Sequence, residues 1–270
     1  ANRSTEMHSD AFDRFHHGHS ALHSLDPRIK VVVTIAFIVS NALLPDGAWM
    51  AFALAWLMIL IANIASGLGV GFSFRRSFIA LPFALAAITV LFSIPGKAVT
   101  SFHFLMWDMV ITDAGLLRFV SIVVRSWLSV QMAILLVAVT EFPKIIHALN
   151  HLRVPTILTV IISFLYRYLF VLADEVMRLL RAREARSAVV AGSNSGGSVL
   201  WRARVTGNMA GKLFLRSYER SDRVYNAMLS RGYKGELMTM HSHEYRASDW
   251  QIGSIVFIGI LIAQIVGRLP

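Results

Sequence analysis

Apolar segments long enough to cross a membrane alternate with short polar segments along most of the chain. Residues 47–74 include 28 consecutive positions without Asp, Glu, Lys or Arg, and residues 77–96 include another 20. About 20 apolar residues in a helix suffice to cross the hydrocarbon core of a bilayer. The expected fold class is therefore an all-α integral membrane protein with about five transmembrane helices and two to three long cytoplasmic or interfacial helices. The predicted spans are about 29–45, 48–66, 77–95, 114–139 and 250–267.

A sixth apolar segment, residues 154–172, allows two interpretations. It contains Arg167, and an arginine at the centre of a bilayer costs about 3 kcal/mol or more unless it reaches the headgroups or finds a partner. If this segment crossed the membrane, the polar residues 173–249 would face the exterior. We expect instead a helix that lies along or within the inner leaflet, buried against other protein. A sixth crossing stays open as the alternative.

The basic residues of the loops set the expected orientation. The loop at 67–76 carries Arg75 and Arg76, whereas the loop before the second span carries Asp46 as its only charged residue. Because Lys and Arg accumulate in cytoplasmic loops, we place 67–76 and the N-terminus in the cytoplasm and 96–113 outside. The expected location is the bacterial plasma (inner) membrane, with several crossings.

Residues 173–249 differ in composition from the spans around them. They hold 13 of the 26 basic residues together with eight acidic ones. Gly, Ser, Asn and Ala fill 191–198, and these residues favour a link over a helix. We predict helices at about 173–189 and 199–231. The four resulting parts are a cytoplasmic or interfacial N-terminal segment (1–28), a four-helix transmembrane region (29–140), a cytoplasmic and inner-leaflet region (141–249) and a C-terminal transmembrane helix (250–270).

The second of these helices carries a stripe of small residues. Ala203, Gly207 and Gly211 stand at i, i+4 and i+8, a spacing that lets another helix approach closely. We expect the first helix to cross the second one there.

Each of the two helices ends with an arginine between small residues. The triplets are Ala185-Arg186-Ser187 and Ser230-Arg231-Gly232. Small neighbours leave the guanidinium prominent, and its planar fork binds a carboxylate through two hydrogen bonds. Two such tips predict two equivalent acceptor grooves on a partner. For Arg231 alone, ordinary capping of a helix C-terminus is the simpler explanation.

Composition and charge exclude several classes of function. The chain has 270 residues, of which 56% are hydrophobic and 16% charged, and its net charge is +10. A soluble enzyme, a disordered tail and a fibrous protein do not fit these values. With no cysteine, a disulfide, a cysteine-based metal site and a thiol nucleophile are excluded.

Histidines and buried arginines are the remaining candidates for chemistry. His16, His17 and His19 are the strongest of a cluster of N-terminal histidines that could bind cobalt, nickel or zinc, but a polar interfacial segment explains them better, and no metal site is assigned. His147 and His151 share the i, i+4 spacing of a metal-binding pair without a third ligand nearby. Ionisable side chains at membrane depth are candidates for function, and we expect the deeper arginine of the fourth span, Arg125, to face the protein interior or a carbonyl cluster.

The order of several motifs resembles a known family. The residues that carry the likeness are LDPRIK at 25–30, FPKIIHALNHLRVP at 142–155, YRY at 166–168, RAREARS at 181–187 and RSYERSDRVYNAMLSRGYKGE at 216–236. With these motifs the chain resembles the transmembrane T component of energy-coupling-factor (ECF) transporters, most closely the cobalt-uptake form, CbiQ. The second arginine triplet begins with Ser230 where the family more commonly has alanine.

The resemblance implies a scaffold that is not itself an enzyme. Such a component joins two cytoplasmic ABC ATPases to a membrane-embedded substrate-binding component, and its two arginine triplets are the family's coupling motifs. ATP and magnesium would bind the partner ATPases, and this chain would bind no cofactor. The nearest approach to a phosphate-binding loop, residues 207–213, is one residue short and ends in Leu213 where Ser or Thr must bind magnesium. Cobalt is the expected substrate of the transporter, with nickel or a vitamin as alternatives.

Two rivals come from other classes of function. A membrane enzyme could act on a phosphate-bearing substrate through the basic segment 173–249, but each acidic residue considered there lies within four positions of an Arg or Lys, as in ordinary helix pairs. A nucleic-acid binder is disfavoured because the segment lacks a recognition motif. The expected partners are therefore the ATPases, the substrate-binding component and the lipid bilayer, with no nucleic acid.

Overall fold

Helices form almost all of the structure, a computed structural model that describes residue 18 and residues 20–95, 97–104, 107–186, 198–235 and 247–269. This confirms the all-α class. In chain order the elements are α2 (Ala21–Ser24), α3 (Pro27–Ala42), α4 (Trp49–Ser66), α5 (Val70–Arg76), the 3₁₀ turn η1 (Ser77–Ala80), α6 (Leu81–Ser93), strands β1 (Ala98–Phe104) and β2 (Trp107–Thr112), α7 (Asp113–Val139), α8 (Phe142–His151), α9 (Thr156–Arg186), α10 (Val199–Ser230) and α11 (Ala247–Val266).

The chain folds as two compact units. One, here called the bundle unit, comprises residues 13–152 and 242–270 and holds α2 to α8 together with α11. The other, here called the two-helix unit, comprises residues 1–12 and 153–241 and holds α9 and α10. The boundary falls at Leu152, so α8 belongs to the bundle unit, where it packs against α3.

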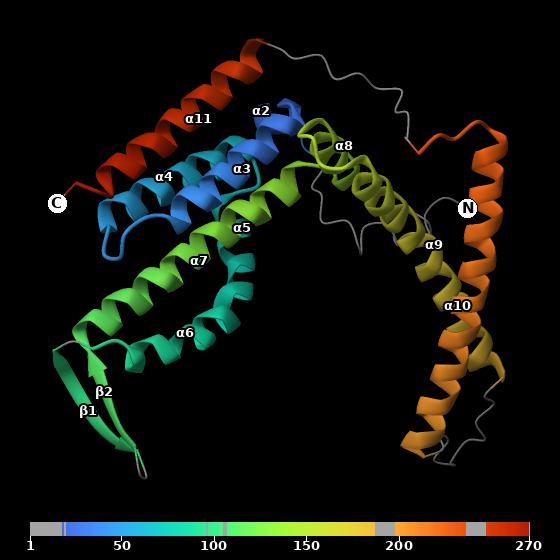
Figure 1. Ribbon diagram of the computed structural model, residues 1–270, viewed down its shortest axis with the longest axis horizontal. Coiled ribbons are helices and arrows are strands. Elements are labelled where there is room, and N and C mark those ends of the chain that lie inside the picture. Colours follow the sequence, from blue (N-terminus) through green and yellow to red (C-terminus); the bar gives the residue numbers. More distant parts are fainter. Residues whose placement is uncertain are drawn as a thin grey trace. The chain divides into compact units, whose positions relative to one another are not determined.

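The core of the bundle unit lies where α3, α4, α7 and α11 meet. Its buried apolar side chains are Phe37, Leu44, Ala51, Phe52, Ala55, Ile59, Leu128 and Ile260. Helices α3 and α11 lie side by side (Figure 1). They run parallel, because Gly253 faces Ile29 near their first turns and Gln264 donates a hydrogen bond from Nε2 to Oγ of Ser40 (2.7 Å) near their last.

A buried ionic cluster joins the first turns of three helices of the bundle unit. Asp26 caps α3 by accepting a hydrogen bond from the Arg28 amide (2.8 Å), which satisfies a free N–H of the first turn. Lys30 is only 8% exposed, and Asp249 of α11 is 6% exposed. The charged neighbours of Lys30 are the carboxylates of Asp26, Asp249 and Glu141 and the ammonium group of Lys144. The motif at 25–30 therefore ties α3 to α8 and α11.

Asp46 forms a second ionic contact, between the α3–α4 loop and α7. Nη2 of Arg125 lies 2.6 Å from Oδ1 of Asp46, and Nε of Arg118 lies 3.7 Å from Oδ2. Asn41 donates to the Arg125 carbonyl oxygen (2.9 Å), so α3 is held to the same turn of α7. Arg125 thus faces the protein interior as the sequence predicts, but its partner is a carboxylate from a distant loop.

Three elements differ from the sequence-based expectation. The predicted loop at 67–76 contains the helix α5, which continues through η1 into α6. The segment 96–113, expected on the exterior, contains an antiparallel hairpin of β1 and β2, drawn beyond the first turn of α7 in Figure 1. The helices predicted at 154–172 and 173–189 are one continuous helix, α9, because its polar half follows the apolar half without a glycine or proline to end it.

Among the described residues, four helices are long and apolar enough to cross a membrane, judged by length and composition: α4, α7, α9 and α11. Three of them match predicted spans. The predicted spans at 29–45 and 77–95 correspond to α3, with 16 residues, and to η1 with the 13-residue α6. At 1.5 Å per residue, α3 is about 24 Å long, shorter than a bilayer core of about 30 Å.

Gly115 provides a test of the packing between α6 and α7. A Cβ at this position would lie 2.6 Å from the Leu91 carbonyl oxygen and 2.8 Å from Oγ1 of Thr112, the N-cap of α7. We expect Gly115→Ala to destabilise the bundle unit by about 1–3 kcal/mol, the usual cost of overpacking. The measurement is the thermal unfolding midpoint in detergent. Gly71→Ala is the control, because a Cβ there meets open space; equal midpoints for both variants would contradict the packing.

Candidate functional site

The two arginine tips lie at exposed helix ends in the two-helix unit. Arg186 is the last residue of α9, and it is exposed together with Ala185. Ser187 lies outside the described residues. The first triplet therefore begins on the last turn of a 31-residue helix, with its guanidinium on the surface.

The second tip is shaped by a glycine. Ser230 is the last residue of α10, and Arg231 is its C-cap. Gly232 has a φ of +82°, the left-handed conformation that glycine adopts at little cost and that ends a helix. The Tyr233 amide then donates to the Met228 carbonyl oxygen (3.0 Å). Ser230, Arg231 and Gly232 are all exposed.

One ion pair and one pocket fix how α9 and α10 meet. Nη1 of Arg216 lies 2.5 Å from Oε1 of Glu175. Nearer the start of α9, Phe164, Arg167 and Tyr168 line a pocket with residues from Val224 to Lys234. Moving forward along α9 therefore means moving backward along α10, so the two helices are antiparallel where they touch.

The antiparallel arrangement separates the two tips. Arg186 lies 11 residues beyond Glu175 on α9, and Arg231 lies 15 residues beyond Arg216 on α10, in the opposite direction. At 1.5 Å per residue, the tips are up to about 39 Å apart along the pair. One groove on a partner could not hold both tips at once.

Arg231 shares a basic pocket with two other cations. The pocket has a volume of about 730 Å³ and is lined by Arg167, Arg231, Lys234, two tyrosines and apolar residues. Among the described residues its lining includes no carboxylate, and Arg167, Arg231 and Lys234 are exposed. Three cations around one cavity favour an anionic ligand, and an arginine fork suits a carboxylate or a phosphate. The sequence singles out Arg167 only as a charge in an apolar segment and does not indicate that it shares a site with Lys234, because 67 residues separate the two.

The small-residue stripe is not where α9 and α10 cross. A Cβ built at Gly207 or Gly211 would meet nothing within 4 Å among the described residues, and Ala203 is exposed. The helices meet through Glu175 and Arg216 instead. The physical reason is helical phase: at 100° per residue, Arg216 is on roughly the opposite face of α10 from the stripe.

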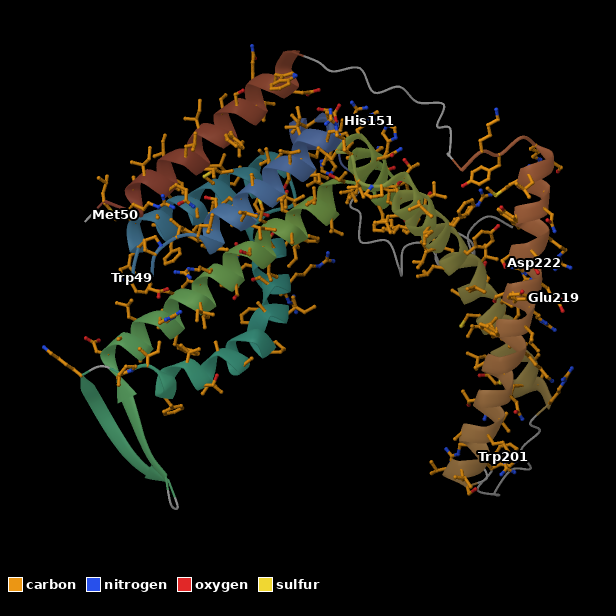
Figure 2. All side chains as sticks on the ribbon, viewed as in Figure 1. Trp49, Met50, His151, Trp201, Glu219 and Asp222 are labelled. Carbon is orange, nitrogen blue, oxygen red and sulfur yellow. The ribbon has the colours of Figure 1, made fainter. Side chains whose placement is uncertain are left out.

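The stripe continues as an exposed aromatic and aliphatic face. Phe214, Tyr218, Tyr225 and Leu229 project from the same side of α10 as Gly207, by the same helical phase. They are 70%, 60%, 56% and 47% exposed, and α10 has no buried residue. Further exposed apolar residues occupy its first turn, where Figure 2 labels Trp201. A long helix with an uncovered apolar face indicates a surface for a partner or a membrane. The helical periodicity of these apolar residues is the feature of the sequence that could have predicted this surface.

The histidine candidates provide no metal site within the described part of the chain. There, no group of three or more His, Asp or Glu residues is placed to hold a metal ion. His147 and His151 contact each other edge to face, with ring centroids 4.7 Å apart. His16, His17 and His19 lie outside the described residues, as does most of the predicted link at 191–198.

Comparison with known proteins shows a match to one family. The family model described as "CbiQ: Cobalt transport protein" matches residues 18–241, which is most of the chain and includes both arginine tips.

Relatives match over nearly their whole length. The "Energy-coupling factor transporter transmembrane protein EcfT" of Lactococcus lactis is 28% identical, covering 96% of this chain and 97% of that protein. The EcfT of Thermosediminibacter oceani is 26% identical, over 93% and 95% of the two chains. An uncharacterized protein of Methanocaldococcus jannaschii is 27% identical, over 94% and 85%.

The phase of the stripe leads to a stability prediction. We expect the double change Gly207→Ala and Gly211→Ala to leave the isolated chain as stable as before or more stable, because alanine favours a helix by about 0.8–1 kcal/mol over glycine. Hydrogen exchange of α10 measures this. If α9 crossed at the stripe, the added methyl groups would separate the helices and exchange would accelerate. Arg216→Ala is the matched comparison, since it removes the observed contact and is expected to accelerate exchange.

Proposed function

The chain belongs to the CbiQ cobalt transport protein family, and from this premise we propose that it couples ATP-driven closure of two cytoplasmic ATPases to a membrane substrate-binding component. The comparisons establish that the chain is a membrane component of an ECF transporter, of the CbiQ type. The proposal concerns the mechanism, the number of ATPases and the substrate.

The separation of the two arginine tips is the observation that carries the proposal. Each tip ends a long helix, and the two ends point in opposite directions along the pair. A symmetric ATPase pair offers the same groove twice, and a scaffold with one tip for each groove would engage both at once. We therefore assign one ATPase to Arg186 and the other to Arg231.

Helix continuity supplies the mechanical link. Four residues separate α8 from α9, and α9 then runs unbroken for 31 residues to the Arg186 tip. An α-helix transmits displacement along its axis, because each turn is hydrogen-bonded to the next. When ATP brings the ATPases together, the two tips would move toward each other and the helix pair would turn about the contact of Glu175 with Arg216. The substrate-binding component, bound to the helix pair, would move with it.

The basic pocket explains how the second tip would hold a carboxylate. An acidic side chain of the ATPase entering beside Arg231 would also meet Arg167 and Lys234. Several cations in one cavity strengthen each charge-assisted hydrogen bond, because the anion needs no other counter-ion. The two docking points therefore differ in strength, with the Arg231 side reinforced.

The exposed face of α10 suits the membrane component. Small residues at Ala203, Gly207 and Gly211 allow close helix approach, and Phe214 and Tyr218 extend the contact. We propose that a helix of the substrate-binding component lies along this face.

Cobalt is the proposed substrate of the transporter, with nickel or a vitamin as alternatives. The description of the matched family supports cobalt. In this proposal the ion is bound by the substrate-binding component, and ATP and magnesium by the ATPases, so this chain carries neither cofactor nor metal ion.

The proposed topology places the N-terminus and the two-helix unit on the cytoplasmic side of the plasma membrane. Helix α9 is apolar enough to cross by composition. Its Arg167, however, lines the basic pocket with Arg231 and Lys234, and three cations belong at the aqueous or headgroup boundary. We therefore keep the first half of α9 in the inner leaflet.

The first functional prediction concerns the tips. We expect Arg186→Ala or Arg231→Ala to weaken ATPase docking and cobalt uptake, and the double change to nearly abolish both, because losing a buried charge-assisted pair costs about 2–5 kcal/mol. Membrane insertion stays normal. Copurification of the ATPases and uptake into vesicles are the measurements.

The controls separate geometry from charge. Arg220→Ala removes an arginine near the middle of α10, 11 residues before Arg231 and outside the pocket, and should have little effect. Arg231→Lys should restore docking only in part, because lysine lacks the fork. Arg167→Ala should weaken docking at the Arg231 side alone. Wild-type uptake by the double variant would refute the coupling mechanism.

The second functional prediction concerns topology. Reporters inserted at 67–76 and at 191–198 are expected to be cytoplasmic, and one at 96–113 exterior. Accessibility to a membrane-impermeant label in intact cells measures this. Opposite sides for the first two would show that α9 crosses the membrane.

A further inference from the structure

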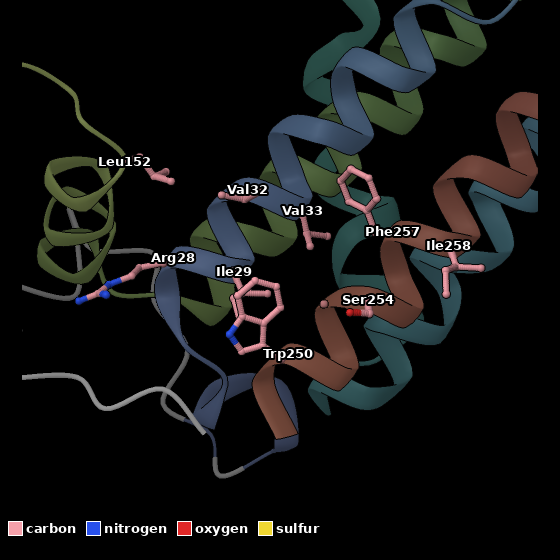
Figure 3. Close-up of a pocket in the computed structure, with 10 residues that line it drawn as sticks. Arg28, Ile29, Val32, Val33, Leu152, Trp250, Ser254, Phe257 and Ile258 are labelled. Carbon is pink, nitrogen blue, oxygen red and sulfur yellow. The ribbon is translucent and has the colours of Figure 1, made fainter. Parts of the chain in front are cut away.

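An open groove lies between α3 and α11 in the bundle unit. It has a volume of about 510 Å³. Ile29, Val32 and Val33 of α3 form one wall, and Phe257 and Ile258 of α11 form the other (Figure 3). The lining is apolar along most of its length. Gly253 also lines the groove, and a Cβ there would lie 3.0 Å from Cγ2 of Ile29, so α3 and α11 approach each other closely at this point.

Polar groups gather at one end of the groove. Arg28 in the first turn of α3 and Trp250 in the first turn of α11 line that end, and Figure 3 shows the Trp250 indole beside Ile29. Trp250 is 66% exposed. Tryptophan and arginine together are typical of the level of lipid headgroups, where an amphipathic ring meets water and a cation meets phosphate. A guanidinium has five N–H donors, so contacts of Arg28 within the protein are compatible with binding a phosphate.

The direction of the groove matches the direction of a lipid. Because α3 and α11 are parallel, Arg28 and Trp250 lie at the same end. From there the groove continues past Val33 and Phe257 toward the middle of both helices. Helix α11 is one of the candidate membrane spans, so this apolar part faces hydrocarbon. An occupant must therefore have an anionic head followed by a hydrocarbon chain.

We propose that this groove is a binding site for one anionic glycerophospholipid, with its phosphate at Arg28 and an acyl chain that passes Trp250 between α3 and α11. The apolar walls alone would accept any lipid, and Arg28 supplies the preference for negative charge. The proposal is independent of the coupling function, since no residue of the two arginine tips takes part.

The test is native mass spectrometry of the full chain released from nanodiscs that contain equal amounts of phosphatidylglycerol and phosphatidylcholine. The wild type is expected to retain one phosphatidylglycerol. Arg28→Gln should lower its retention relative to phosphatidylcholine about fivefold, the effect expected of one basic residue near an anionic lipid. Arg28→Lys should retain most of the preference. Arg75→Gln removes an exposed arginine outside the groove and should change nothing.

A second variant tests the groove itself and does not depend on Arg28. Val32→Trp fills the groove from an exposed position, and it should lower retention of both lipids without changing the elution profile of the protein. A photoreactive residue at Ile258 should form adducts with lipid, in the chain alone and in the assembled transporter. Equal retention of the two lipids by the wild type, or adducts with a partner protein instead of lipid, would overturn the proposal.

Discussion

A buried charge in an apolar environment must be neutralised by another part of the protein, and this constraint organises the bundle unit. Lys30 is nearly inaccessible; its ammonium group donates a hydrogen bond to the His23 carbonyl oxygen (3.1 Å), and the charges that act on it include the carboxylates of Asp26, Asp249 and Glu141. Removing either the ammonium group or the carboxylates would leave the remaining charge uncompensated, at a high cost in folding free energy. The cluster therefore holds the first turns of three helices together, and the contact of Asp46 with Arg125 does the same between α7 and the α3–α4 loop. The apolar core and the groove beside α11 both depend on helices fixed in this way.

Buried charges do not hold the two-helix unit together. Most of its charged side chains are exposed, and α10 has no buried residue. Such a helix cannot be stabilised by its own packing, because burial of an apolar face supplies most helix stability in proteins. Among the described residues, nothing covers the exposed face around Phe214 or the arginines at the two helix ends. A partner that covers them would contribute both docking energy and stability to this unit.

The parts that depend on local sequence could be predicted. The bounds of α10 follow from Ser198, which caps its first turn, and from Gly232, whose left-handed conformation ends it. The parts that depend on phase and on distant contacts could not. The stripe at Gly207 suggested a crossing, but only the structure shows that α9 meets α10 through Arg216, on roughly the opposite face. Similarly, the sequence shows Asp46 only as the charged residue of a loop, whereas the structure pairs it with Arg118 and Arg125 of α7.

Arg167 shows why an isolated charge in an apolar segment is ambiguous in sequence. Along the chain it is surrounded by apolar and aromatic residues, and a crossing helix or a surface helix would explain it equally well. In three dimensions it lines a cavity with Arg231 and Lys234. Desolvating one arginine is costly, and desolvating three cations together is costlier still, because they also repel one another. This portion of α9 therefore belongs where water, headgroups or a partner's carboxylates can reach the three cations.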